Sequence, residues 1–149
     1  MWLYPWNKLI FSVLLVASIA LAEENTSDCR ISDEEFVSQL YTMKDWDTIY
    51  SVYRTNLPCI PDDGMYAEGY SDVIVRAFAT QWEDIKTLHT LASRDPEFRV
   101  FVLRHINATT DPIELKQALS NAESNCPAGI NSLCKEVAKQ AAAALEEML

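Results

Sequence analysis

The chain has 149 residues, of which 12 are basic and 22 are acidic, and its formal net charge is −10 at pH 7. Nucleic acid and anionic membranes repel so acidic a protein, so the composition excludes both as main partners and favours a basic protein partner. The alternative is that the acidity only keeps the protein soluble.

The first residues have the pattern of an export signal. Lys8 precedes a short apolar run, residues 9–17, and the small residues of Ala20-Leu21-Ala22 are typical of a signal-peptidase site. We therefore expect residues 1–22 to be removed and residues 23–149 to form one domain with a net charge of −11, since Lys8 is the only charged residue of the leader. An uncleaved membrane anchor is the alternative, although the apolar run is short for a span.

The chain contains four cysteines, all beyond the expected cleavage point: Cys29, Cys59, Cys126 and Cys134. An even number in an exported chain predicts two disulfides, for which three pairings exist. Pairing nearest neighbours in sequence favours Cys29–Cys59 and Cys126–Cys134. The loop-entropy estimate for these two bonds is roughly 3.5 and 2.5 kcal/mol of stability. No thiol would then remain as a nucleophile.

Helical spacing begins at a capping box, Ser32 to Glu35, in which each end can hydrogen-bond the other. An apolar stripe follows it: Phe36, Val37, Leu40 and Tyr41. The same spacing predicts a second helix that Pro58 ends, with an aromatic-rich face expected in the core: Trp46, Ile49, Tyr50 and Tyr53.

A turn at residues 61–64 leads into a helical region over residues 65–92, which the sequence leaves open as one helix or two. Gly69 within it costs about 1 kcal/mol relative to alanine, so we expect another helix to approach closely there. Asp95-Pro96 and Asp111-Pro112 each predict a helix start, because the acid caps and the proline loses no needed N–H. With a last helix over residues 131–145, the chain is predicted to be an all-α, single-domain bundle of six or seven helices.

No residue pattern indicates catalysis, a metal or a cofactor. His89 and His105 lie in different predicted helices without ligands at metal-binding spacing, so both are interpreted as packed or capping residues. The paired acids, such as Asp62-Asp63, are interpreted as solvated surface. The candidate functional segment is instead a small polar loop between two helices: Asn107, Ala108, Thr109, Thr110 and Asp111. The alternative is that this segment is only a connection.

Three segments together carry a family resemblance: residues 66–72 (YAEGYSD), residues 98–109 (FRVFVLRHINAT) and residues 126–134, which begin Cys-Pro-Ala-Gly and end Leu-Cys. In this order and spacing the chain resembles the immunity proteins of type VI secretion amidase effectors, specifically those paired with the fourth amidase family. The resemblance covers about two thirds of the expected mature chain.

The resemblance implies a periplasmic, all-helical homodimer that binds and inhibits a peptidoglycan amidase delivered by neighbouring cells. The amidase is similar to cysteine hydrolases and cuts between D-glutamate and diaminopimelate. It would be blocked by a protruding loop, here Asn107 to Asp111, inserted into its cleft. Members of the family usually have an acidic residue where this chain has Asn107, which bears on partner specificity.

Two other functions fit an exported, acidic, disulfide-bonded helical protein. A periplasmic acid-stress chaperone would loosen when its carboxylates titrate at low pH and would then protect client proteins. A small carrier of apolar ligands would enclose a cavity lined by its aromatic residues. An enzyme has the least support, because no catalytic set is evident.

Overall fold

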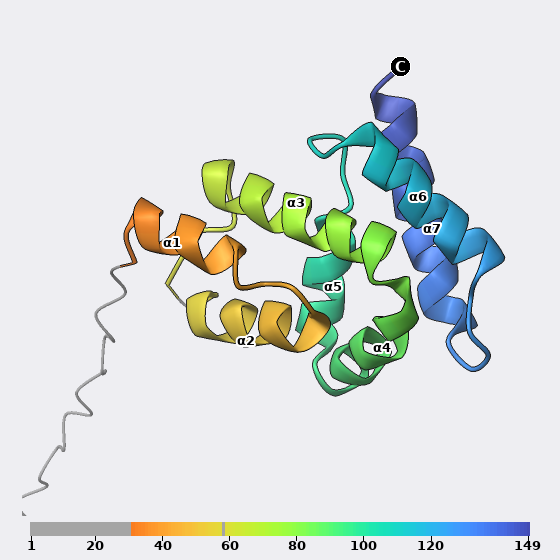
Figure 1. The fold of residues 1–149 in the computed structure, drawn as a ribbon, viewed down its shortest axis with the longest axis horizontal. Helices are drawn as coiled ribbons and strands as arrows, with labels where there is room; N and C mark the ends of the chain where they lie inside the picture. Colours follow the sequence, from red (N-terminus) through yellow and green to blue (C-terminus); the bar gives the residue numbers. More distant parts are fainter. Residues whose placement is uncertain (1–30, 58) are drawn as a thin grey trace, which may run out of the picture.

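The computed structural model describes residues 31–57 and 59–149, and within these residues every regular element is a helix. Seven α-helices and one 3₁₀-helix follow one another (Figure 1): α1 Asp33–Leu40, α2 Trp46–Asn56, α3 Gly64–Thr80, η1 Trp82–Asp84, α4 Ile85–Arg94, α5 Pro96–Arg104, α6 Pro112–Ser124 and α7 Asn131–Glu147. The all-α prediction is confirmed. The region left open, residues 65–92, is two α-helices joined by the 3₁₀ turn. None of the described helices combines the length and apolar character that a membrane span needs.

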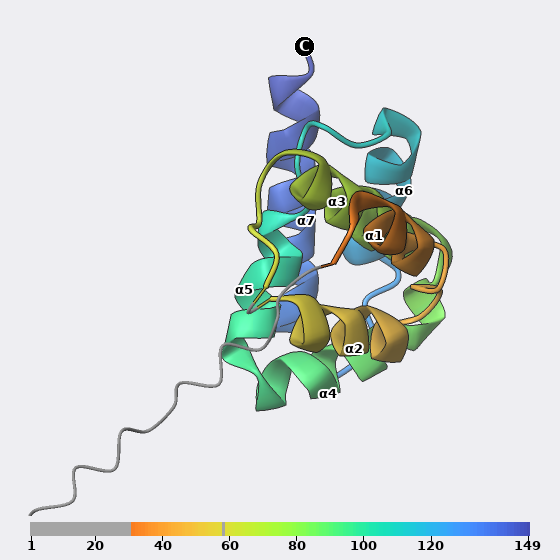
Figure 2. The same cartoon turned by 90° about the vertical axis from the view of Figure 1, so that its left-hand side faces the viewer.

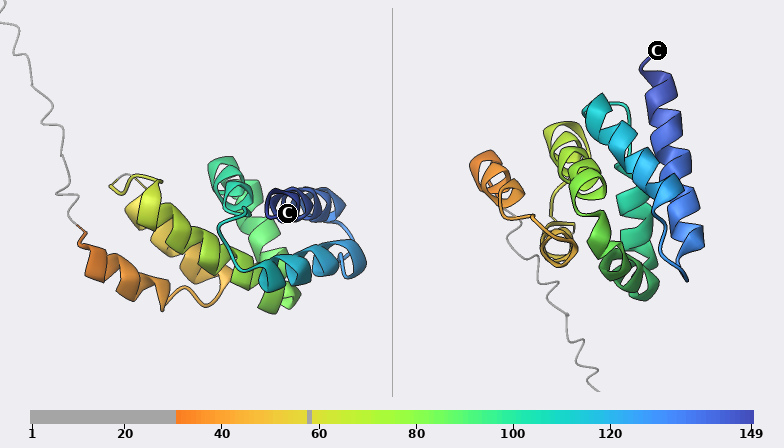
Figure 3. Two further views of the ribbon diagram at one scale, coloured as in Figure 1. Left: turned by 90° about the horizontal axis from the view of Figure 1, so that it is seen from above. Right: turned by 45° about the vertical axis from the view of Figure 1, so that its right-hand side comes forward.

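Four helices form a row in the order α1, α3, α6, α7, each in contact with the next (Figure 3). The other three α-helices also contact one another in sequence order, α2 with α4 and α4 with α5. Aromatic rings join the two groups: Trp46 of α2 lies 4.9 Å from Phe78 of α3, and Tyr70 of α3 lies 5.1 Å from Phe101 of α5, centroid to centroid. The core therefore lies between the two groups of helices.

The helix starts follow the predicted capping chemistry. The Ser32 hydroxyl accepts from the Glu35 N–H while the Glu35 carboxylate accepts from the Ser32 N–H. Asp95 accepts from the N–H of Phe98 at the start of α5. Each bond satisfies a backbone donor that the first helical turn leaves without a partner. Local sequence is enough to place these ends.

The predicted apolar stripe of α1 is only partly buried. Phe36 is fully buried and Leu40 is half-buried, but Tyr41 is 76% exposed. The helix ends at Leu40 and packs one face on α3, so Tyr41 lies beyond the buried face. In α2, by contrast, the predicted core face is present: Trp46, Ile49 and Tyr53 are buried and Tyr50 is half-buried.

The close helix approach expected at Gly69 is present. A Cβ atom added to Gly69 would lie 2.9 Å from Phe36 Cε1 and 3.0 Å from Leu40 Cδ1. Both neighbours are side chains of α1, and Phe36 is fully buried. The glycine thus lets α1 pack directly on the backbone of α3, which explains why its helix-propensity cost is tolerated.

Replacing Gly69 with valine is expected to lower the free energy of unfolding by about 1–3 kcal/mol, because the larger side chain would push α1 away from α3. Glu68→Val is the matched control, since Glu68 is the preceding residue of the same helix and is exposed. Urea unfolding of the two variants measures the difference. Equal stability of both variants would contradict the close packing.

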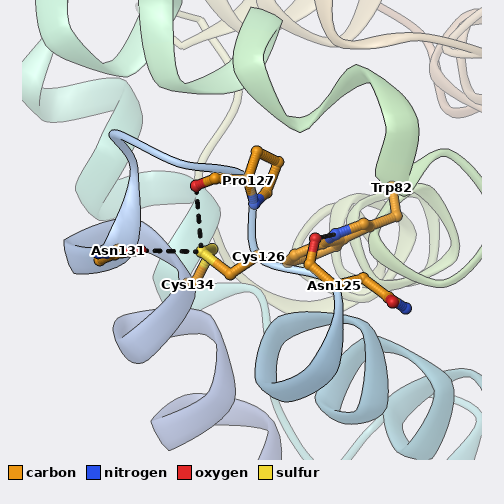
Figure 4. The surroundings of a disulfide bond; sticks show 6 residues. All are labelled: Trp82, Asn125, Cys126, Pro127, Asn131 and Cys134. Atoms are coloured by element: carbon orange, nitrogen blue, oxygen red, sulfur yellow. Dashed lines mark hydrogen bonds between the residues drawn. A yellow bond between two sulfur atoms is a disulfide. The ribbon is translucent and has the colours of Figure 1, made fainter.

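The described part of the chain contains one disulfide, Cys126–Cys134, which joins the end of α6 to the first turn of α7 (Figure 4). This predicted pair is confirmed, with the two Cα atoms 6.0 Å apart. The other predicted pair, Cys29–Cys59, includes Cys29, which lies outside the described residues, so it stays a prediction. The expected leader, residues 1–22, lies outside them too.

Candidate functional site

The predicted functional loop connects the end of α5 to the start of α6 and lies at one end of the molecule, away from α4 (Figures 1 and 2). It begins after His105, the C-cap of α5, and ends at Asp111, the N-cap of α6. The Asp111 carboxylate accepts from the N–H of Ile113 at 2.6 Å and of Glu114 at 3.3 Å. Both ends of the loop are thus held by helices.

Asn107 organises the turn from within. Its side-chain oxygen accepts from the Thr109 N–H at 3.0 Å and from the Thr109 hydroxyl at 2.6 Å. Its backbone carbonyl accepts from the Thr110 hydroxyl at 2.9 Å. An asparagine that bonds two residues ahead is a common turn-forming arrangement. Three side chains of the loop therefore bond within the loop and fix its shape.

A buried hydrogen-bond chain ties the loop to the body of the protein. The Asn107 side-chain NH₂ donates to Ser71 Oγ of α3 at 2.9 Å. Ser71 Oγ also lies 2.9 Å from His105 Nδ1 and donates to the carbonyl of Ala67 at 2.8 Å. Ser71 and His105 are 1% and 2% exposed, so these bonds are shielded from competing water.

Asp62, in the segment before α3, lies next to the other nitrogen of the His105 ring. His105 Nε2 lies 3.1 Å from Asp62 Oδ1, although the two are not aligned for a linear hydrogen bond. The other carboxylate oxygen of Asp62 forms an ion pair with Arg104. The interpretation of Asp62 as solvated surface was wrong, because its side chain is only 18% exposed and faces Arg104 of α5 and the buried His105 ring. Asp63, its neighbour, is exposed.

Serine, histidine and aspartate in contact are the residue types of a common hydrolase site. Nucleophilic attack needs the serine oxygen to reach a substrate. Here Ser71 Oγ is buried and its bonding capacity is used by Ala67, Asn107 and His105. The arrangement is suited to holding the loop in position.

Burial in an aromatic environment lowers the pKa of His105 below its usual value of 6.5, against the opposing effect of Asp62; the Arg104 charge adds to the lowering. The imidazole lies 4.4 Å from the Phe101 ring and 5.7 Å from the Tyr70 ring, centroid to centroid. Removing the charged form from water is the main cost. His105 is therefore neutral at pH 7 and packs as part of the core.

The lowered pKa predicts how stability depends on pH. The unfolded chain takes up a proton near the ordinary histidine pKa while the folded chain does not, so His105 favours unfolding as the pH falls below about 6.5. The loss of unfolding free energy grows until the pH reaches the lower pKa of the folded state. Urea unfolding at about pH 7.5 and at about pH 5.5 measures how much unfolding free energy is lost between these two pH values. We expect the His105→Asn variant to lose less than the natural protein, and an equal loss in both would contradict a lowered His105 pKa.

The five predicted loop residues lie together, but they differ in exposure. Thr109 and Asp111 are exposed, Asn107 and Ala108 are half-buried, and Thr110 is 8% exposed. Thr110 thus holds the loop and offers little surface. The exposed surface continues into α6, where Ile113 is 75% exposed. The part of this region that is open to a partner is therefore centred on Thr109, Asp111 and Ile113.

Sequence reasoning missed two residues of this region, Asp62 and Ser71. Asp62 belongs to no recognisable motif, and Ser71, although it lies in the resembled segment 66–72, has no spacing that links it to the loop. Each lies more than 30 residues before the loop in the chain. The available signal was His105, a histidine on an apolar helix face that directly precedes the loop and needs polar partners when buried. No group of three or more metal-ligating side chains gathers in residues 31–57 and 59–149.

Comparison with protein-family models, with curated proteins and with solved structures found no match to this chain.

Proposed function

We propose that this protein is a periplasmic immunity protein that binds a peptidoglycan-cleaving amidase effector of type VI secretion and inserts the Asn107–Asp111 loop into its active-site cleft. The observation that carries the proposal is the buried anchoring of that loop through Asn107, Ser71 and His105. The resemblance to immunity proteins points to the same loop. The proposal involves no cofactor.

A loop fixed before binding loses little conformational freedom when it enters a cleft, which favours a tight complex. The bonds between Asn107, Thr109 and Thr110 and the two helix ends supply that fixation here. The outward-facing side chains of the loop itself, Thr109 and Asp111, are small, so a groove built for an extended peptide can accept them. Competition with the substrate for that groove then explains inhibition.

Asn107 has a specific part in this proposal. Its NH₂ group donates to Ser71 Oγ, and a carboxylate at this position could not donate that bond. Where members of the resembled family carry an acid, this chain carries a side chain turned toward the body of the protein. We infer that the partner specificity of this chain lies in Thr109, Asp111 and the exposed Ile113 more than in Asn107.

The net charge of −10 supports a basic partner, because opposite charges speed encounter between proteins. Fast capture matters for an antidote, since each free amidase molecule can cut the wall. A homodimer, which the resemblance implies, would present two such loops.

The test mixes the oxidised protein with a purified amidase that cuts between D-glutamate and diaminopimelate. We expect a stoichiometric complex by size-exclusion chromatography with light scattering, and loss of muropeptide cleavage at equimolar protein. Absence of both a complex and inhibition with amidases of this class would overturn the proposal. Protection of client proteins at about pH 2–3 would then favour the chaperone, and tight binding of a fluorescent apolar probe at neutral pH would favour the carrier.

A further inference from the structure

A pocket of about 590 Å³ lies where α3 ends, beside η1 and the last turn of α6. Its walls include Gln81, Trp82, Glu83 and Asp84 from the α3–α4 connection, Asn121 of α6 and Asn125, the C-cap of α6. Among the described residues, no lysine, arginine or histidine lines it. The α5–α6 loop adjoins the other end of α6, so this pocket is separate from the candidate site above.

The hydrogen-bond donors of this pocket are largely used by the protein itself. The Trp82 indole N–H donates to the carbonyl of Asn125 at 2.9 Å (Figure 4). The Asn121 NH₂ donates to the carbonyls of Phe78 and Ala79 at the end of α3. The Asn125 NH₂ lies 3.4 Å from Asn121 Oδ1. These bonds satisfy carbonyls at the end of α3 and leave few hydrogen-bond donors of the pocket free for a ligand.

Hydrogen-bond acceptors and negative charge remain available in this pocket. Glu83 and Asp84 are exposed, and neither forms an ion pair within the described part of the chain. Gln81 Oε1 is buried and accepts no hydrogen bond from the described residues. The C-terminal end of α3 carries partial negative charge, and its last turn has no basic residue to offset it. A ligand that satisfies this pocket has to bring donors and positive charge.

We propose that this pocket binds a guanidinium or ammonium group carried on a short alkyl stem. The charged group would lie against Glu83 and Asp84, where charge-assisted hydrogen bonds are strongest. The stem would lie along Trp82 and Pro127, which lie close together beside Asn125 (Figure 4). This chemistry has two sources, the side chain of a basic protein and a free small amine. The proposal does not depend on the immunity function.

Butylguanidinium and butylurea test the proposal as a pair, because they share shape and stem and only the first is charged. Each is titrated into the oxidised protein while the indole N–H signals are followed by NMR. The Trp82 signal, assigned with a Trp82→Phe variant, is expected to shift with butylguanidinium and to stay in place with butylurea. Trp46 is 1% exposed and serves as the internal reference. Equal shifts with both compounds would overturn the proposal.

A double variant, Glu83→Gln with Asp84→Asn, is expected to weaken butylguanidinium binding about tenfold. It should fold normally, since both residues are exposed and Asp84 makes no side-chain cap to α4. The matched control, Glu146→Gln with Glu147→Gln, removes the same charge from an exposed pair at the end of α7. Undiminished binding in the first variant, or equal weakening in the control, would refute a local site.

Two further ligands separate the sources of the charged group. Agmatine represents a free amine, and a blocked tripeptide with one central arginine represents a protein side chain. Binding of both supports a basic protein segment as the natural ligand, whereas binding of agmatine alone supports a free amine. Failure of both, with a Trp82 signal that does not move, would overturn the proposal.

Discussion

Thr109→Arg is expected to abolish inhibition of the partner amidase, weakening the complex by at least about 30-fold, as is usual for a central contact residue. Thr109 is an exposed residue at the tip of the loop, with its hydroxyl bonded to Asn107 Oδ1. Arginine adds volume and charge at the place where the loop would enter a closely fitting groove. Titration of amidase activity against each protein variant measures the loss.

Thr90→Arg controls for the change in net charge. Thr90 is an exposed threonine of α4, and its hydroxyl donates to the carbonyl of Lys86. Helix α4 lies at the opposite end of the molecule from the loop (Figures 1 and 2). We expect this control to inhibit normally, and both variants to unfold at similar urea concentrations. Full inhibition by Thr109→Arg would mean that another surface binds the amidase. Thr110 is unsuited to this test, because it is buried and bonds Asn107.

Phe101→Ala is expected to lower the free energy of unfolding by about 3–5 kcal/mol, the usual loss for removing a buried aromatic ring. The Phe101 side chain is 3% exposed and lies at the centre of an aromatic cluster. Its ring centroid is 4.7 Å from that of Tyr53, 5.1 Å from that of Tyr70 and 4.4 Å from that of His105. The truncation would leave a cavity where α2, α3 and α5 meet, next to the residue that anchors the loop.

Val100→Ala is the control on the same helix, because Val100 is the preceding residue and is 62% exposed. We expect it to change stability by less than about 1 kcal/mol, as surface substitutions generally do. Urea unfolding monitored by circular dichroism gives both values. Similar losses in the two variants would show that Phe101 is not a core residue.

The helix starts could be predicted from sequence because capping is local. Ser32 and Glu35 bond each other, Asp95 accepts from the Phe98 N–H, and Asp111 accepts from the N–H groups of the second and third residues after it. Each set of bonding groups lies within four residues. The division of residues 65–92 could not be predicted in this way. Neither a proline nor a glycine marks the break at Gln81, where Asn121 of α6 bonds the last carbonyls of α3.

The position of the loop could also be predicted, since a short polar segment separates two well-marked helices. Its anchoring could not. Asp62 and Ser71 reach His105 and Asn107 only because tertiary packing places α3 and the segment before it beside the end of α5, and their sequence separations of 43 and 36 residues leave no periodic signal. The same packing places Asp62 beside Arg104, where an adjacent pair of acids suggested open surface.

By itself, the sequence determined the all-helical class, most helix starts, the Cys126–Cys134 pairing and the close approach at Gly69. Each of these features depends on residues near one another in the chain or on the type of one residue. Tertiary structure alone decided which polar groups are buried together and which loop atoms remain outside. The physical reason is that burial and hydrogen bonding between distant residues depend on how whole helices pack, and many sequences with the same helical pattern would bring different side chains into contact.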